Sequence, residues 1–239
     1  MQARLTCCLF FVLLFSKTIF AQKNVTTVGI QYKPIFPVSF VGTGKITNDL
    51  NNIHFETELT SGFSGGVVIR HSFSDLLALE GGINYVKRKY ALNFTDGAFV
   101  HETSFRMIGY EIPFSAVIFA RIGEKLYANG SLGPALDMFA SNIVTYDQFF
   151  NHVSFRNHIF QPAINGNIGF EYRTPKSGNI YIGVSYHRPF SYIYFDKVKY
   201  SNGGRDATVG NLLVGNYLTI DLRYFFHEDP VKETKHKAE

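Results

Sequence analysis

The sequence has no tryptophan, only two cysteines and no hydrophobic run long enough for a membrane-spanning helix. Both cysteines, Cys7 and Cys8, lie within the first 21 residues. The rest of the chain therefore has no disulfide, thiol nucleophile or cysteine-bound metal. Past residue 22 the densest apolar stretch, 112–120, is interrupted by Pro113 and Ser115. This pattern excludes a polytopic helical membrane protein.

A strong excess of one charge is also missing. The chain has 23 Lys and Arg against 19 Asp and Glu, a formal net charge of +4, which makes no case for nucleic-acid binding. Hydrophobic residues make up 46% and aromatic residues 16% of the chain, so intrinsic disorder is excluded. The composition fits one domain with a sizeable core, or one closed barrel.

The N-terminus has the pattern of a secretory signal peptide. Arg4 precedes an apolar core over residues 5–15, and a more polar stretch ends at the small residue Ala21. We predict cleavage after Ala21, a barrel domain over 22–226 and a charged periplasmic tail over 227–239. The apolar core is too short to span a bilayer as a helix, so a retained anchor is the weaker alternative.

The dominant pattern of the mature chain is a period of two, which is typical of half-buried strands. The last segment is the clearest, because Leu218, Ile220 and Leu222 share one face while Asp221 and Arg223 share the other. Comparable alternation predicts strands over 25–33, 55–70, 77–93, 104–121, 126–146, 160–173, 180–187 and 218–226.

The connections between these segments alternate between long and short. Those over 34–52, 94–101, 146–155 and 196–207 are longer, whereas those over 72–75, 121–125 and 174–179 are tight. This rhythm is typical of outer-membrane barrels. We predict an all-β fold: an eight-stranded antiparallel up-and-down transmembrane β-barrel with short periplasmic turns and longer extracellular loops.

The polar face of the strands is rich in ionisable residues, which cannot line an apolar ligand cavity without a large desolvation cost. A soluble carrier barrel is therefore disfavoured, and a β-sandwich is the weaker alternative because many of these strands exceed the length that it needs. Eight strands leave an interior just wide enough for side chains, which favours mutual ion pairing over a narrow ion or solute channel. The predicted lumen charge network consists of Glu56, Glu58, Arg70, Glu80, Arg88, Glu111, Asp137, Glu171, Arg173, Asp221 and Arg223.

Two features need accommodation in a closed barrel. Prolines 113, 134 and 162 interrupt strand patterns, and we expect bulges or strand ends there. Without tryptophan, the aromatic girdle must come from Tyr and Phe side chains. The candidates are Tyr172, Tyr186, Tyr224 and Phe226.

Several local motifs resemble those of the PorT-like family of small outer-membrane β-barrel proteins. They are GIQYKP at 29–34, GINY at 82–85, YEIPF at 110–114, GFEYR at 169–173 and the closing YLTIDLRYFF at 217–226. The resemblance covers essentially the whole mature chain, and the tail over 227–239 departs from it. It implies an outer-membrane location, while one branch of this family is similar to components of a protein-secretion apparatus.

One pair of residues allows an enzymatic alternative. His152 and Ser154 lie on one strand face and, with a nearby carboxylate, would resemble small barrel esterases that act on lipid A. Rim residues of this kind are more often merely solvated, so we expect no catalytic residues. The other histidines, His101, His158 and His187 among them, are scattered, and we expect no metal and no cofactor.

Aromatic side chains in the long connections are candidates for an interaction surface. They are Phe149, Phe150, Tyr192 and Tyr194, which either bind a partner or pack against neighbouring loops and lipid headgroups. The sequence thus predicts a monomeric barrel with a structural or interaction role in the cell envelope. Its expected partners are outer-membrane lipid, the barrel-insertion machinery and an envelope protein, without nucleic acid.

Overall fold

The computed structural model describes residues 25–38 and 42–227. The predicted signal peptide and the tail beyond His227 lie outside the described residues. Every regular element of the described part is a β-strand. No helix in this part of the chain is long and apolar enough to cross a membrane.

Eight strands form a closed ring. The order is β1, β13, β10, β9, β6, β5, β4 and β3, and β3 pairs with β1 to close it, with each pair antiparallel. The ring strands are β1 (Val25–Phe36), β3 (Ile53–Ser72), β4 (Leu77–Asp96), β5 (Phe99–Arg121), β6 (Leu126–Phe139), β9 (Phe160–Arg173), β10 (Asn179–Pro189) and β13 (Tyr217–Phe225). The eight segments predicted from the period of two correspond to these strands.

Three of the four longer connections contain further strands, which the sequence pattern did not reveal, whereas 94–101 is the hairpin that joins β4 to β5. The further strands are β2 (Ile46–Leu50), β7 (Ile143–Tyr146), β8 (Phe150–Arg156), β11 (Tyr194–Asn202) and β12 (Arg205–Leu213). The last four form a separate sheet in the order β12-β11-β8-β7, while β2 extends the ring sheet beside β3. The predicted strand over 126–146 was therefore too long, because β6 ends at Phe139 and β7 belongs to the other sheet.

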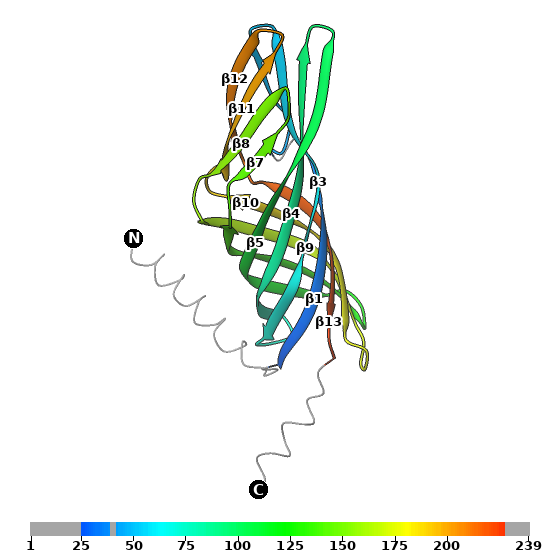
Figure 1. The fold of residues 1–239 in the computed structure, drawn as a ribbon. Coiled ribbons are helices and arrows are strands. Elements are labelled where there is room, and N and C mark those ends of the chain that lie inside the picture. The colour runs from blue at the N-terminus through cyan, green and yellow to red at the C-terminus, as the bar shows by residue number, and fades with distance from the viewer. Residues whose placement is uncertain (1–24, 39–41, 228–239) are drawn as a thin grey trace, which may run out of the picture.

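The molecule consequently has two levels, which Figure 1 shows as a ring with a narrower extension above it. We call the closed ring with the short turns the lower barrel. We call the region around β2, β7, β8, β11 and β12 the upper part; it includes β3 up to residue 59, β4 from residue 90 and β5 up to residue 107. Both described chain ends, at residues 25 and 227, lie at the bottom of the lower barrel.

The inside and outside of the chain exchange polarity between these levels. In β4 the inward side chains change from Glu80 and Asn84 in the lower barrel to Leu92 and Phe94 in the upper part. The outward positions change in the opposite sense, from the exposed Ile83 to lysines and Asn93. This exchange is what a strand needs if it faces lipid below and water above.

A β-bulge achieves the same exchange in β3. The register with β4 shifts between Leu59 and Ser61, so Thr60 is the extra residue. Phe55 and Leu59 therefore point inward above the bulge, although they share odd numbering with the exposed Val67 and Ile69 below it. One extra residue reverses the facing of every later side chain, which is why the apolar alternation in the sequence continues without a break.

The upper part has its own hydrophobic core between its two sheets. Phe55 and Phe94 from the ring strands pack edge-on or stacked against Tyr200 of β11, with ring centroids 6.4 and 6.1 Å apart. Phe94 also lies 5.1 Å from Phe150 of β8, and Phe139 lies 5.4 Å from Tyr194. Fully buried aromatic rings thus fill the space that continues the lumen upward.

The outer surface of the lower barrel is an apolar band with aromatic edges. Tyr32, Phe63, Tyr85 and Tyr110 form a chain of ring contacts across β1, β3, β4 and β5, with centroids 5.9, 6.0 and 5.9 Å apart. The predicted girdle residues Tyr172, Tyr186, Tyr224 and Phe226 also face outward. Tyrosine and phenylalanine thus occupy the positions where barrels often carry tryptophan.

Pro113 and Pro134 coincide with interruptions of the ladder, whereas Pro162 lies near the start of β9 in an unbroken register with β6. The β4–β5 pairing breaks between Gly81 and Asn84, beside Pro113, and the β5–β6 pairing breaks between Pro113 and Ala116. Proline offers no N–H to a ladder, so these breaks leave no donor missing from a continuous pair.

Candidate functional site

The most elaborate constellation of polar side chains fills the interior of the lower barrel. At its lower level Arg70 of β3 donates through Nε to Glu80 Oε1 at 2.7 Å and through Nη1 to Glu171 Oε2 at 2.5 Å. Arg173 donates through Nε to the other oxygen of Glu171 at 2.7 Å. The two arginines and the two glutamates thereby form one connected network.

A third arginine extends this network to β13. Arg223 donates to Glu80 Oε2 at 2.8 Å and to Asp221 Oδ2 at 2.6 Å. Lys33 of β1 lies 3.6 Å from the same Asp221 oxygen. Arg70 also lies over the Phe225 ring at 3.8 Å, so its guanidinium is enclosed on its flat face as well.

Two glycines make room for an aromatic ring inside this level. Gly169 and Gly183 are directly opposite in the β9–β10 register. A Cβ on either glycine would overlap the hydroxyl of Tyr181, which covers both. That hydroxyl donates to Asn167 Oδ1 at 2.6 Å. Small residues here are therefore required by packing.

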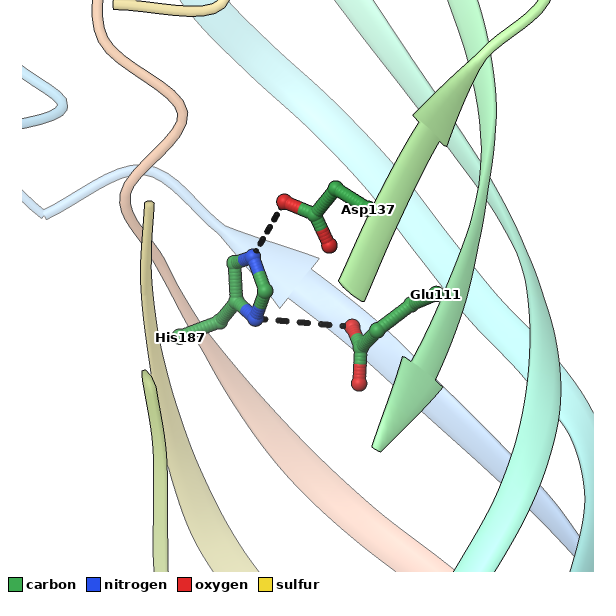
Figure 2. Close-up of side chains that lie close together, drawn as sticks. All are labelled: Glu111, Asp137 and His187. Atoms are coloured by element: carbon green, nitrogen blue, oxygen red, sulfur yellow. Dashed lines mark hydrogen bonds and ion pairs between the residues drawn. The ribbon is translucent and has the colours of Figure 1, made fainter. Parts of the chain in front are cut away.

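The upper level of the lumen contains Glu111 of β5, Asp137 of β6 and His187 of β10, which point toward one another (Figure 2). His187 Nε2 lies 2.8 Å from Asp137 Oδ2, and its Nδ1 lies 3.6 Å from Glu111 Oε2. All three are buried. Asn165 and Tyr217 complete the group, since the Asn165 amide donates to Glu111 Oε1 at 2.8 Å and the Tyr217 hydroxyl donates to Glu111 Oε2.

The hydrogen bonds engage both ring nitrogens of His187. The amide N–H of Asn165 is used by Glu111, so the Asn165 oxygen faces His187 Nδ1 and accepts from it. On the other side of the imidazole ring, Nε2 lies 2.8 Å from Asp137 Oδ2. His187 is thus fixed between oxygen atoms of neighbouring side chains.

The same three residues have the types and proximity of metal ligands, with ligand atoms within 4.8 Å of one another. A metal needs an unprotonated imidazole nitrogen directed at it, whereas both nitrogens of His187 already have acceptor partners. The buried Arg88 guanidinium, 4.7 Å above the Tyr217 ring, adds positive charge beside Asp137. The donor set fits an internal ion pair better than a metal.

The network spans the full width of the ring. β3 and β9 are four strands apart in a ring of eight, so the bond from Arg70 to Glu171 crosses the lumen. The bond from Tyr217 of β13 to Glu111 of β5 crosses it again at the upper level. Between the levels remains a cavity of about 30 Å³, room for about two water molecules.

Nine of the eleven predicted lumen residues line this interior. They are Arg70, Glu80, Arg88, Glu111, Asp137, Glu171, Arg173, Asp221 and Arg223. Lys33 and His187 also belong to it, although the sequence analysis omitted them. Both share their face with polar neighbours at a spacing of two, Gln31 and Ser185, and this signal could have identified them.

The prediction for Glu56 and Glu58 was wrong. They lie on the outer face of the upper part, because the bulge at Thr60 separates them from the lumen-facing half of β3. Glu56 accepts from Lys45 Nζ at 2.7 Å and from Asn93 Nδ2 at 3.1 Å. These contacts, with that of Lys45 the largest, lower the pKa of Glu56 below its ordinary value.

His152 and Ser154 do meet a carboxylate, but in a different arrangement from a hydrolase. His152 Nε2 lies 2.5 Å from Asp196 Oδ1 and 3.0 Å from Ser154 Oγ, and Ser154 donates to the same Asp196 oxygen at 3.0 Å. A catalytic triad uses the two imidazole nitrogens for the two partners. Here His152 Nδ1 has no partner among the residues that the structure describes, and all three residues are completely buried.

The predicted aromatic surface is partly internal. Phe150 and Tyr194 belong to the core of the upper part, and Phe149 packs against that core. Tyr192 is half-buried, and its backbone carbonyl accepts from Gln161 at 2.8 Å. Phe150 and Tyr194 therefore stabilise the upper part from within and present no surface to a partner.

Comparisons with known proteins agree with this architecture. No family model and no curated protein sequence matches the chain. Among solved structures, the outer membrane protein OprG from Pseudomonas aeruginosa is similar with a TM-score of 0.53 and 13% identity, over 87% of this chain and 98% of that one. The outer membrane protease OmpT from Escherichia coli has a TM-score of 0.41 and 10% identity, over 84% and 96% of the two chains. The ring closure, the outward apolar band and the OprG similarity together give this chain the fold of the outer-membrane β-barrel proteins.

Proposed function

We propose that the protein is a sealed, non-catalytic barrel of the outer membrane that has a structural or interaction role in the cell envelope. The lower barrel spans the membrane, with its short turns in the periplasm, and the upper part projects from the outer surface. The resemblance of the sequence motifs to the PorT-like family supports this location and favours a partner in a secretion or surface assembly.

The observation that carries this proposal is the filled interior. Five carboxylates and five fixed cations, besides His187, occupy the lumen of the lower barrel, and bonds cross it at two levels. Above them the aromatic core of the upper part closes the same path. An ion or solute would have to break both layers, so a channel is the weaker alternative.

An esterase is disfavoured by burial. The Ser154 hydroxyl is directed at Asp196 inside the upper part, where neither a lipid ester nor water has access. A nucleophile requires an open position beside it for the reacting carbonyl. The three residues instead join β8 to β11 through buried hydrogen bonds.

The outer surface of the upper part is then what remains for an interaction. Its clearest feature is a pair of strand edges without a backbone ladder partner, since β5 pairs with β6 only from Gly109 downward and β7 pairs only with β8 in the described registers. The two edges are joined by a side-chain contact, in which His101 Nε2 of β5 lies 3.1 Å from Asp147 Oδ2. Beside these edges Val100 is 69%, Val144 48% and Tyr146 72% exposed. Free edges with apolar side chains are suited to a partner that adds an extended segment.

The experiment tests this edge directly. Val144→Lys with Tyr146→Lys replaces the exposed apolar side chains of β7, and we expect loss of the co-purifying envelope partner. Leu50→Lys is the control. Leu50 is likewise an exposed apolar residue of the upper part, but it lies on β2, which belongs to the ring sheet and not to the sheet of β7. Both variants should keep the migration shift between unheated and boiled samples that closed barrels show in SDS. Equal partner recovery by all three proteins would reject the β5–β7 edge.

A further inference from the structure

A basic patch lies on the outside of β4 and β5, directly above the aromatic edge of the apolar band. It consists of Lys87, Lys89 and Arg106, and all three side chains point outward. Lys89 and Arg106 are directly opposite in the β4–β5 register. Among the strand pairs that the structure describes, no other directly opposed pair joins two Lys or Arg residues.

Like charges directly opposite on an exposed sheet face are destabilising. No carboxylate compensates for them here, since none of the three forms an ion pair with a described residue. The outward carboxylates of the neighbouring strand stretches are Glu56 and Glu58, which lie 2.7 and 4.0 Å from Lys45, and Glu102. Glu102 is four residues from Arg106, about 13 Å along the strand. The positive charge of the patch is thus not compensated by the described part of the protein, and an external anion would stabilise it.

The height of the patch identifies the source of that anion. Tyr85 and Tyr110 are directly opposite in the same two strands, with rings 5.9 Å apart, and they lie near the upper edge of the apolar band, which the exposed Ile108 opposite Lys87 continues by one row. Lys87 is two and Lys89 four residues above Tyr85, about 7 and 13 Å along the strand. This interval is where lipid headgroups lie.

The backbone at the patch is fixed as well. The bulged Thr60 of β3 donates its hydroxyl to the backbone carbonyl of Lys89 at 3.0 Å. The bulge is also the point at which β3 exchanges its inward and outward faces. The two opposed cations therefore project from a pinned stretch of sheet at the boundary between lipid and water.

We propose that Lys87, Lys89 and Arg106 bind the phosphate groups of a phosphorylated glycolipid in the outer leaflet, whose acyl chains lie along the apolar band below Tyr85 and Tyr110. Arg106 supplies a planar fork suited to phosphate oxygens, and the lysines supply point charges. The inference deepens the proposed function, because it rests on the outer-membrane location with the upper part outside.

The probe is lipid A that carries both phosphates, compared with the same lipid after its phosphates have been removed. Purified protein in detergent is mixed with each, and native mass spectrometry gives the fraction that retains one lipid. We expect retention of the phosphorylated form. Lys89→Gln with Arg106→Gln should weaken it about thirtyfold, since each basic residue near an anionic lipid surface contributes roughly a factor of five.

Two variants make the result specific. Lys125→Gln with Lys176→Gln removes the same charge from the exposed short turns at the other end, and it should retain the lipid like the wild type. Lys89→Arg with Arg106→Lys keeps both charges and should also retain it. Equal loss in the turn variant, equal retention in Lys89→Gln/Arg106→Gln, or no preference for the phosphorylated lipid would each overturn the proposal.

The test separates this inference from the proposed function. Each preparation is first examined for the migration shift between unheated and boiled samples in SDS. Absence of the shift in the wild type would remove the membrane barrel itself. A normal shift with indifferent lipid binding would remove only the glycolipid site.

Discussion

Arg70 and Glu171 lie 101 positions apart in the sequence, yet their side chains form an ion pair across the full width of the ring. Arg70 is also bonded to Glu80, so one guanidinium compensates two buried carboxylates. Arg223 and Arg173 also contact these carboxylates, so removal of Arg70 would leave both with one partner and the interior with an uncompensated negative charge.

Replacement of Arg70 by methionine should destabilise the barrel by about 3–5 kcal/mol, because Glu80 and Glu171 each lose a buried partner. Urea unfolding in lipid vesicles measures the difference. Arg121→Met is the control, since within the described part of the chain the Arg121 guanidinium donates only to the backbone carbonyls of Gly123 and Glu124, in an exposed turn. Similar losses in the two variants would contradict the role of the network.

The wild-type protein should show no discrete conductance steps in a planar bilayer. The double variant Arg70→Met/Glu171→Gln should remain silent too, because the aromatic core around Phe94 and Tyr200 closes the path above. Salt-dependent steps from the wild type would favour a channel. Steps from the double variant alone would show that the lower network is the only seal.

Ser154→Ala should leave the acylation pattern of lipid A unchanged in cells that express the variant. Its expected effect is a small loss of stability, about 1 kcal/mol, because Asp196 loses one hydrogen-bond donor. Mass spectrometry of lipid A and urea unfolding separate the two outcomes. A changed acyl pattern with unchanged stability would support the esterase.

The pair of Lys45 and Glu56 predicts an acid-sensitive contact on the outside of the upper part. The pKa of Glu56 is lowered in the folded protein, chiefly by the hydrogen bond from Lys45. Its contribution to stability is therefore present above the ordinary value of 4.5 and is lost as the pH falls through the lower folded pKa. The difference in unfolding free energy between the wild type and Glu56→Gln should shrink over that interval. A difference that grows with acidity would contradict the pair.

Deletion of Thr60 should disrupt the upper part while the lower barrel still closes. Without the bulge, Phe55 and Leu59 would turn outward and Glu56 and Glu58 inward, against the apolar core. Limited proteolysis of intact vesicles should then cleave the upper hairpins while the SDS migration shift persists. Thr60→Ala keeps the extra residue and should remain resistant.

The sequence was sufficient for the eight ring strands because all of them alternate, and many do so over a length that few soluble sheets need. It was also sufficient for most of the lumen charges. On a regular strand whose apolar side chains face lipid, a charged residue such as Asp221 or Arg223 must face the interior. It failed at Glu56 and Glu58, where a single inserted residue reverses the facing and an uninterrupted apolar pattern hides the reversal.

The contacts among distant strands could not be predicted in the same way. The meeting of His187 with Asp137 requires β9 between β10 and β6, and the meeting of His152 with Asp196 requires β8 beside β11. Such proximity depends on ring order and stagger, which period-two alternation does not specify. The strands within the long connections were missed because their short alternation is mixed with turn residues.

The last strand of the ring has a consequence for biogenesis. β13 provides Asp221 for Lys33, Arg223 for Glu80 and Tyr217 for Glu111, so three earlier strands obtain their counterparts from the final stretch of the chain. A ribosome-truncated chain would expose unmatched charges toward a narrow lumen and have no partner for β1. The interior charges are therefore balanced, and the ring closes through β1, only after β13 has been added.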